Sequence, residues 1–206
     1  MNFYLSSHGT GNNSQIIKRL VGDRKIGFIP NAVDYLNKKD RDKSNNQKIK
    51  ELEDLGINVE IIDLRKYFGR KENLRKKLVE LGGVWVRGGN TFILRRAMKL
   101  SGFDNLIIRI NKLNSDFLYG GYSAGICVLA PELKGLKLVD KPEMNPYNKS
   151  KRIIWKGIGL IDYLILPHYK SNHKESTDID KCVNYCIKHK IKYKPLRDGE
   201  VIIIKQ

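Results

Sequence analysis

One serine in this chain lies between two glycines, where one apolar run ends and the next begins. Residues 118–131 read LYGGYSAGICVLAP, with Ser123 at the centre of a Gly-x-Ser-x-Gly pattern. In a nucleophile elbow, a strand turns sharply into a helix at such a serine, and the small flanking residues leave its hydroxyl room to attack a carbonyl. A simple glycine-rich turn has the same pattern. The interpretation therefore depends on which partners the rest of the chain offers.

A serine nucleophile needs a general base, and the chain has four histidines. His168 ends the apolar run YLILPH, which predicts a strand whose end lies at the same edge of the sheet as Ser123. We therefore expect His168 to be the base. His8 follows the first predicted strand and could line the pocket, His173 lies in a polar loop, and His189 is expected at the surface near a helix terminus.

The base in turn needs a carboxylate that fixes its tautomer and stabilises the imidazolium. Asp198, in PLRDGEV, precedes the last predicted strand, 30 residues after His168. Asp140, in LVDKP, comes 17 residues after Ser123. Both aspartates neighbour turn-forming residues and could be ordinary turn residues. The residues themselves leave the choice between them open.

A glycine pair precedes another predicted helix. In VRGGNTF, Gly88 and Gly89 end a predicted strand and Asn90 stands at the helix start. Glycines let backbone N–H groups approach a ligand, and a helix N-terminus adds partial positive charge. We expect this loop to supply one N–H group of an oxyanion hole, alongside the N–H of Ala124. The same sequence pattern is also typical of a tight strand-to-helix turn that has no such role.

Short β-rich runs alternate with longer amphipathic runs, which is typical of an α/β protein with a mostly parallel sheet. The strands are continuously apolar, so we expect helices on both faces of the sheet. Strands are predicted at 2–6, 25–31, 58–64, 83–88 and 116–122, and in the runs DYLILPHY and GEVIIIKQ. Helices are predicted at 12–21, 43–55, 72–81, 91–113 with a break at Ser101-Gly102, after Ser123 as far as Pro131, and at 175–190. The mixed-charge run 38–50 is expected to be a solvated loop that leads into a helix.

The composition fits one folded domain over residues 1–206, with 41% hydrophobic and 30% charged residues and no internal repeat. The first ten residues lack a basic n-region, and no run approaches the ~20 apolar residues of a membrane span, so we expect no membrane association. Cys127, Cys182 and Cys186 are too few for a disulfide framework and favour a reducing cytoplasm. Core packing is favoured over a metal pair for Cys182 and Cys186, and we expect no metal or other cofactor.

The formal net charge of +17 is the one unusual bulk property. A concentrated basic patch would indicate nucleic-acid binding, but the basic residues are spread from Lys18 to Lys205. General solubility is therefore favoured over a dedicated polyanion site. We do not expect nucleic acid as a partner.

Taken together, RGGNTF, GYSAG and LPHY, in this order and at these spacings, resemble the serine peptidases of the aspartyl dipeptidase (peptidase E) family. The resemblance runs over nearly the whole chain. It implies a flavodoxin-like fold similar to that of the class I glutamine amidotransferases, and the cyanophycinases are relatives. It also implies that Ser123 is the nucleophile, that His168 is the base, and that Gly89 and Ala124 form the oxyanion hole.

The resemblance also bears on the third catalytic residue. The family usually has a glutamate just before the last strand, and Asp198 stands at that place with a shorter side chain. An aspartate in the loop after the nucleophile helix has also been implicated in family members, and Asp140 matches it. We prefer Asp198 and keep Asp140 in reserve.

The implied reaction is hydrolysis of short peptides with an N-terminal aspartate, through an acyl-enzyme on Ser123. Arg87 stands where the family more often has a small residue, and it either pairs with an acidic substrate or points to solvent. Asn90 is a second candidate for substrate binding. The expected partner is a short peptide, and the expected state is a monomer or a homodimer.

Two other functions stay open. One is a cyanophycinase-like or other amide hydrolase on the same fold, and the other is a non-catalytic basic protein that binds a polyanion. Amidotransferase activity is not expected, because those enzymes carry cysteine at the elbow. Here that position is Ser123, and Cys127 lies a helical turn farther on, where we expect it to face away from the site.

Overall fold

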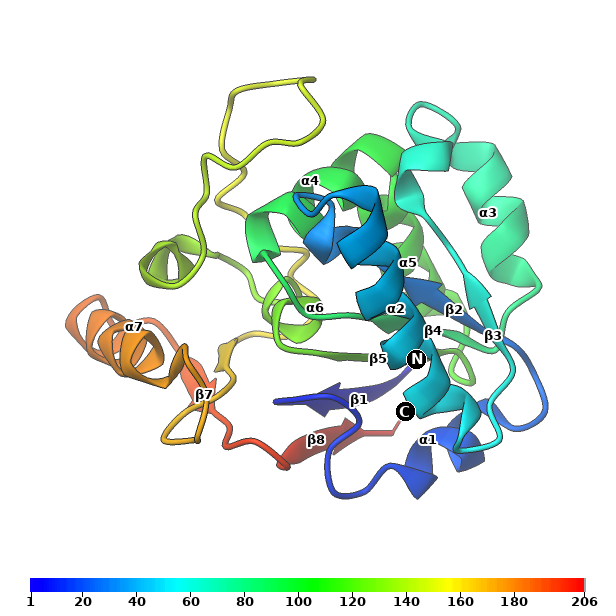
Figure 1. Cartoon of the computed structure of the whole chain (residues 1–206), viewed down its shortest axis with the longest axis horizontal. Coiled ribbons are helices and arrows are strands. Elements are labelled where there is room, and N and C mark those ends of the chain that lie inside the picture. The colour runs from blue at the N-terminus through cyan, green and yellow to red at the C-terminus, as the bar shows by residue number, and fades with distance from the viewer. Residues whose placement is uncertain (206) are drawn as a thin grey trace.

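A central six-stranded sheet carries the fold in the computed structural model, which describes residues 1–205 (Figure 1). The strand order is β3-β2-β4-β5-β1-β8, and β8 alone runs antiparallel to its neighbour in that sheet. The strands are β1 (Asn2–Ser6), β2 (Ile26–Ile29), β3 (Val59–Ile61), β4 (Gly83–Val86), β5 (Leu118–Tyr122) and β8 (Val201–Ile204). The predicted mostly parallel α/β sheet is thereby confirmed.

Helices connect the strands and cover both faces of the sheet, as expected. The α-helices are α1 (Gln15–Val21), α2 (Lys38–Glu53), α3 (Lys71–Val79), α4 (Thr91–Ser101), α5 (Phe103–Leu113), α6 (Ala124–Cys127) and α7 (Ser176–Lys188). Three short 3₁₀ helices are η1 (Asn31–Val33), η2 (Leu64–Tyr67) and η3 (Lys134–Leu138).

Alternating side chains of the central strands enter two separate apolar cores. In β1, Phe3 and Leu5 belong to the core under α3, α4 and α5, whereas Tyr4 belongs to the core under α1 and α2. In β4, Val84 and Trp85 divide in the same way. Successive side chains of a strand point to opposite faces, so a strand that is apolar throughout is buried from both sides.

A second, two-stranded sheet lies outside the central one. It consists of β6 (Leu164–Leu166) and β7 (Tyr193–Pro195), which run parallel, and it shares a third apolar core with α7 and η3. The strand predicted in DYLILPHY is therefore present but short, and β7 was not predicted. Cys182 and Cys186 are buried free thiols in this third core, as expected.

The expected loop over residues 38–50 is wrong, because α2 begins at Lys38. The side chain of Asn37 accepts a hydrogen bond of 3.0 Å from the N–H of Asp40, which caps the helix, and Asp40 places negative charge in the first turn. The predicted break near Ser101 is confirmed. Gly102 separates α4 from α5 in a left-handed conformation, with φ 76°.

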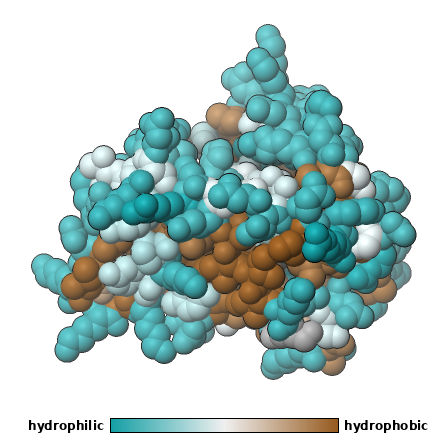
Figure 2. All heavy atoms as spheres, turned by 90° about the horizontal axis from the view of Figure 1, so that it is seen from below, coloured by the Kyte–Doolittle hydropathy of each residue, from teal (hydrophilic) through white to brown (hydrophobic). Residues whose placement is uncertain are grey.

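The sheet ends at β8, to which no further strand of residues 1–205 is paired. Figure 2 shows the face seen from below Figure 1, on which apolar residues lie at the centre with hydrophilic residues around them. Val201 and Ile203 of β8 are partly buried against the core under α1 and α2. None of the helices in the described part of the chain is both long enough and apolar enough to cross a bilayer.

The corner between β5 and α6 packs directly on the end of β4. A Cβ atom at Gly125 would lie 2.1 Å from the carbonyl oxygen of Val86, and one at Gly121 would lie 2.5 Å from the same oxygen. Both distances are far inside van der Waals contact. Glycine at these two positions is therefore what allows the β5–α6 corner to approach β4.

We predict that Gly125→Ala lowers the free energy of unfolding by about 2–3 kcal/mol, because the added methyl group forces the backbone of Val86 to shift. The matched control is Gly135→Ala, where a Cβ atom would lie 3.4 Å from its nearest neighbour, a ring carbon of Tyr185. We expect the control to stay within about 1 kcal/mol of the parent. Urea unfolding of both variants checks this, and equal stability of the two would contradict the packing argument.

Candidate functional site

The loops after several strands meet at one cavity of about 460 Å³. His8 follows β1, Gly89 follows β4, Ser123 follows β5, and His168 follows β6, and all four line the cavity. Carboxyl ends of parallel strands lie at the same edge of a sheet, which is where α/β proteins bind ligands. The central sheet therefore brings His8, Gly89 and Ser123 together, and His168 reaches the same cavity from the separate two-stranded sheet.

Ser123 occupies the strained corner between β5 and α6. Its backbone angles are φ 50° and ψ −121°, a conformation that residues with a side chain rarely adopt. The backbone N–H of Ser123 donates to the carbonyl of Ser6 over 3.4 Å. The Ser123 hydroxyl has no hydrogen-bond partner among residues 1–205, so it is available to a ligand in the cavity.

Two backbone N–H groups of the loops that meet at this corner have no acceptor in the described part of the chain. They belong to Gly89 and to Ala124, the first residue of α6. Gly89 has φ 142°, and a Cβ atom there would lie 2.5 Å from the carbonyl oxygen of Ala32. A Cβ atom on Gly88 would lie 2.8 Å from Cβ of Ser123, which shows how closely the two loops approach. Only glycines permit this arrangement of donors.

His168 and Asp198 are joined by a hydrogen bond of 2.7 Å between Nδ1 and Oδ1. The pairing of β6 with β7 explains this contact. Leu166 lies opposite Pro195, and the two chains leave the small sheet side by side, with His168 two residues beyond one strand and Asp198 three residues beyond the other. His168 also has a positive φ of 62°, and its side chain is almost completely buried.

Ser7 connects the same pair from the end of β1, and sequence reasoning missed it. Its hydroxyl donates to Oδ1 of Asp198 over 2.8 Å and accepts from the backbone N–H of His168 over 2.8 Å. Ser7 is fully buried. A small polar residue directly after a buried strand was the only signal in the sequence. Ser7 therefore positions both partners of the His168–Asp198 hydrogen bond.

The surroundings of the pair keep His168 neutral and Asp198 charged. Burial is the main cause that lowers the pKa of His168 to about 4, and the neighbouring His173 lowers it further. Asp198 acts in the opposite direction. Burial would raise the pKa of Asp198, but the hydrogen bond from Ser7 and the interactions with His168 bring it below its usual value. At neutral pH, His168 Nδ1–H thus donates to an ionised carboxylate, and Nε2 is free to accept a proton.

Asp140 lies elsewhere in the same cavity. Its Oδ2 accepts a hydrogen bond of 2.8 Å from the N–H of Thr91 at the start of α4, and no hydrogen bond joins it to His168. Burial raises the pKa of Asp140 to about 6, in spite of the hydrogen bonds from Thr91. The structure therefore brings Asp198, and not Asp140, to His168.

Arg87 lines the cavity and is buried, so its side chain does not point to solvent. The guanidinium donates to Gly88 O, to Oδ1 of Asn45 and to the hydroxyl of Ser44, which are all neutral acceptors. Within residues 1–205, no carboxylate lies within ion-pair distance of it. Arg87 is thus a buried cation without a counter-charge at the edge of the cavity.

Asn90 also lines the cavity, but its side chain has structural partners. Its Oδ1 accepts from the N–H groups of Phe92 and Ile93 and caps α4, and its Nδ2 donates to the carbonyl of Lys141. These bonds use most of the hydrogen-bonding capacity of the amide. Asn90 therefore joins the glycine loop to the segment that carries Asp140 and Lys141.

Three histidines meet at the cavity and are the one group in the described residues with the proximity needed for a metal ion. Nitrogen atoms of His8, His168 and His173 all lie within 4.8 Å of one another. The rings of His168 and His173 stack in parallel, with centroids 3.7 Å apart and an angle of 9°. Parallel rings direct their in-plane lone pairs side by side, whereas metal ligands must converge on one point. A metal ion would require one of these rings to turn.

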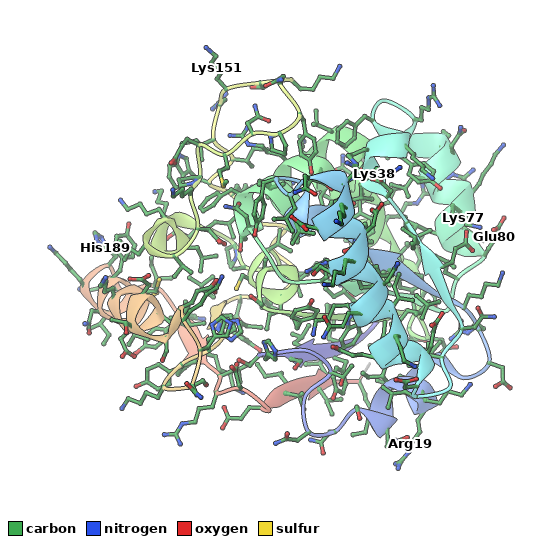
Figure 3. All side chains as sticks on the ribbon, viewed as in Figure 1. Arg19, Lys38, Lys77, Glu80, Lys151 and His189 are labelled. Carbon is green, nitrogen blue, oxygen red and sulfur yellow. The ribbon has the colours of Figure 1, made fainter. Side chains whose placement is uncertain are left out.

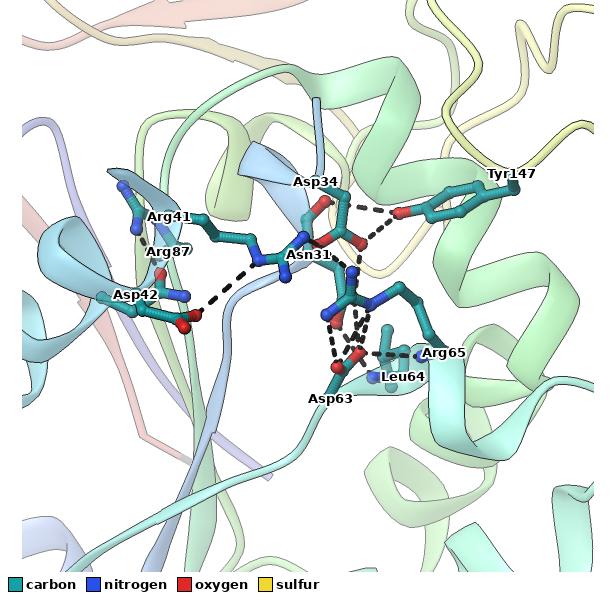
Figure 4. A network of polar contacts seen from close by, with 10 residues as sticks. Asn31, Asp34, Arg41, Asp42, Asp63, Leu64, Arg65, Arg87 and Tyr147 are labelled. Atoms are coloured by element: carbon teal, nitrogen blue, oxygen red, sulfur yellow. Dashed lines mark hydrogen bonds and ion pairs between the residues drawn. The ribbon is translucent and has the colours of Figure 1, made fainter. Parts of the chain in front are cut away.

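A polar network supports the loop that packs against Gly89 (Figure 4). Asn31, in η1, donates to both Asp34 and Asp63, and its Oδ1 accepts from the N–H of Leu64. Burial raises the pKa of Asp34, against the hydrogen bond of 2.6 Å from the hydroxyl of Tyr147. These contacts hold η1 in place, and η1 contains Ala32, the residue whose carbonyl excludes any side chain at position 89.

The sequence of this chain is similar to those of known peptidases. The sequence model of peptidase family S51 matches residues 4–206. An uncharacterized peptidase of Listeria monocytogenes is 30% identical over 159 residues, which cover 76% of this chain and 71% of the relative. A second uncharacterized peptidase, from Listeria innocua, is 27% identical over 157 residues, covering 76% of this chain and 70% of the relative.

Two solved structures have similar folds. A Listeria monocytogenes protein whose name assigns it provisionally to peptidase E superposes with a TM-score of 0.74 at 24% identity, over 100% of this chain and 98% of its own. A peptidase from an acI-B1 actinobacterium superposes with a TM-score of 0.72 at 14% identity, over 99% of this chain and 83% of its own.

We predict that His168 stays neutral down to about pH 5 and takes up a proton with a pKa of about 4. An unfolded chain protonates histidine near pH 6.5. Between about pH 6.5 and pH 4 the unfolded state therefore binds a proton that the folded state does not, and the free energy of unfolding must fall as the pH falls. NMR titration of the imidazole nitrogens measures the pKa, and urea unfolding at pH 5 and pH 7 measures how the free energy of unfolding depends on pH.

The control variant is His168→Gln, which removes this titration and should flatten the pH dependence of stability. A His168 ring that is already charged at pH 6 would contradict the described environment.

Proposed function

Because the chain belongs to peptidase family S51, and is on that ground a serine peptidase, we propose that it hydrolyses short peptides with an N-terminal aspartate through an acyl-enzyme on Ser123. The His168–Asp198 hydrogen bond of 2.7 Å carries the proposal, because it leaves Nε2 of the buried ring free at the cavity that Ser123 lines. A serine without such a base is a weak nucleophile.

In the proposed first step, Oγ of Ser123 attacks the carbonyl carbon of the scissile bond while Nε2 of His168 takes the hydroxyl proton. The tetrahedral intermediate then expels the amine, which receives that proton from His168. A water molecule next attacks the acyl-enzyme by the same route, releases the amino acid and restores the serine. Asp198 stabilises the imidazolium in both halves of the reaction.

The negative charge of the tetrahedral oxygen needs preorganised donors. The N–H groups of Gly89 and Ala124 have no acceptor among residues 1–205, and each belongs to a residue directly next to the close contact between Gly88 and Ser123. Donors that are already in place cost no reorganisation when the charge develops. This supports their proposed role as the oxyanion hole.

The charges of the cavity favour an acidic substrate with a free amine. Arg87 is a buried cation without a counter-charge, and an aspartate side chain would supply one. Asp140 and Glu175, which also line the cavity, are the carboxylates available to a substrate amine. The preference for an N-terminal aspartate rests on these charges.

We predict a graded loss of activity on an Asp-Leu dipeptide in four variants. Ser123→Ala and His168→Ala should lower kcat by at least about 10,000-fold, and Asp198→Asn by about 1,000-fold, because the three groups act as one unit. Asp140→Asn tests the alternative carboxylate and should lower kcat less than about tenfold, since Asp140 does not contact His168; loss of its proposed contact with the substrate amine should instead raise KM. Steady-state assays of folded variants give these values.

Three outcomes would count against this mechanism. A larger loss in Asp140→Asn than in Asp198→Asn would assign the third role to Asp140. A folded parent that cleaves only β-aspartyl linkages would favour a cyanophycinase-like hydrolase, and one that cleaves no Asp-X or β-aspartyl bond would favour a non-catalytic, polyanion-binding protein.

We predict that Arg87→Met lowers kcat/KM for Asp-Leu by tenfold or more relative to Ala-Leu, since a hydrogen bond to a charged group contributes about 1.5–3 kcal/mol. Lys48→Met is the control, because Lys48 lines the same cavity but already pairs with Glu51 at 2.7 Å. The ratio of the two kcat/KM values in each variant is the measurement. An unchanged ratio in Arg87→Met would remove Arg87 from substrate recognition.

A further inference from the structure

A second cavity, of about 560 Å³, lies between α4 and the segment 145–156. It shares no lining residue with the cavity at Ser123. Six of its twelve lining residues are basic and none is acidic: Arg95, Arg96, Lys99, Lys149, Arg152 and Lys156. The segment forms the outlying loop beside α4 in Figure 1, and Lys151 stands at its tip in Figure 3.

Two of the six basic residues build the wall of this cavity. Arg95 is buried and pairs with Asp104 at 3.0 Å, and its Nε donates to the carbonyl of Lys156. Arg96 is buried too and donates to the carbonyls of Ser150 and Arg152. Nε of Arg96 has no acceptor, and burial lowers the pKa of its guanidinium. These bonds tie the segment to α4 and give the cavity a fixed shape.

The other four basic residues leave positive charge at the opening. The side chains of Lys149, Arg152 and Lys156 are exposed, and none of them has an ion-pair partner among residues 1–205. Lys99 lies 3.9 Å from a carboxylate oxygen of Asp104, which Arg95 already holds at a shorter distance. A cavity lined by positive charges attracts anions and raises their local concentration.

The rest of the lining is largely apolar. Leu100, Ile153, Ile154 and Trp155 contribute to it. The indole of Trp155 is partly exposed, and its ring meets Phe92 edge to face, with centroids 5.6 Å apart and an angle of 82°. Phe92 is buried in α4 and so fixes one side of the indole. A flat ligand can contact the remaining surface of such a ring.

We propose that this cavity binds a nucleoside polyphosphate, with the phosphates at Lys149, Arg152 and Lys156 and the base against Trp155. A ligand that fits must combine several negative charges with a flat apolar group, and a nucleoside triphosphate has both. Inorganic polyphosphate has only the charges, and a nucleoside has only the flat group. The site is separate from the peptidase site, and its occupation does not depend on the proposed reaction.

Titration of the full chain with three probes tests the proposal by calorimetry at low and moderate salt. ATP should bind with a Kd below about 1 mM, inorganic triphosphate at least fivefold more weakly, and adenosine not measurably. Raising the salt should weaken the binding of ATP, because exposed charges are screened. The chain has two tryptophans and Trp85 is buried, so saturable quenching of tryptophan emission should be lost in Trp155→Phe.

Charge reversals locate the site. The double variant Lys149→Glu with Arg152→Glu should weaken the binding of ATP at least 20-fold. The matched control, Lys76→Glu with Lys112→Glu, makes the same change of net charge on α3 and α5. We expect it to change the Kd for ATP less than threefold. Arg87→Met, in the peptidase cavity, should bind as the parent does. Melting temperatures confirm that each variant is folded.

Four results would overturn the proposal. They are no saturable binding of ATP, equal losses in the two charge-reversed doubles, triphosphate binding as tightly as ATP, and loss of ATP binding in Arg87→Met. A protein that binds single-stranded oligonucleotides but not ATP would also contradict it, since the ligand would then be a nucleic acid.

Discussion

The close approach of two strand-to-helix corners is the constraint on which the rest of the site depends. The corner after β5 packs on the carbonyl of Val86 at the end of β4, and Gly125 is the residue that allows it. This contact places Ser123 beside Gly88 and holds its backbone in a strained conformation. Strain of this kind persists only where the surrounding structure enforces it. The sheet and its two apolar cores supply that enforcement.

The charge states at the cavity follow from burial as much as from pairing. Burial lowers the pKa of His168 to about 4, so the ring is neutral and ready to accept a proton at physiological pH. Asp198 keeps its charge because Ser7 and His168 donate to it. Burial raises the pKa of Asp140 to about 6, because the hydrogen bonds from Thr91 do not outweigh it. The pKa values of Asp198 and Asp140 are thus shifted in opposite directions, and only Asp198 contacts the histidine.

The pattern of apolar residues was sufficient to predict the central sheet, whose strands are continuously apolar, and the break between α4 and α5 at Gly102. It failed at residues 38–50, where mixed charges suggested a loop and a single cap at Asn37 starts a helix. Ser123 and His168 could be chosen from their places at predicted strand ends, whereas the residues alone left Asp198 and Asp140 open and only the family resemblance favoured Asp198. Ser7 could not be chosen, because its role depends on contacts with residues more than 150 positions away. The cationic cavity could not be predicted either, because Arg96 and Lys149 line one cavity only through tertiary packing.

The serine at the strained corner is the proposed nucleophile, activated by the buried His168–Asp198 pair. Reaction of the folded protein with a fluorophosphonate, followed by peptide mass spectrometry, tests this role most directly. We expect a single adduct on Ser123 that is absent in Ser123→Ala and forms at least about 100-fold more slowly in His168→Ala. An adduct on another residue, or no adduct on the folded parent while a control serine peptidase reacts, would rule out Ser123 as the nucleophile.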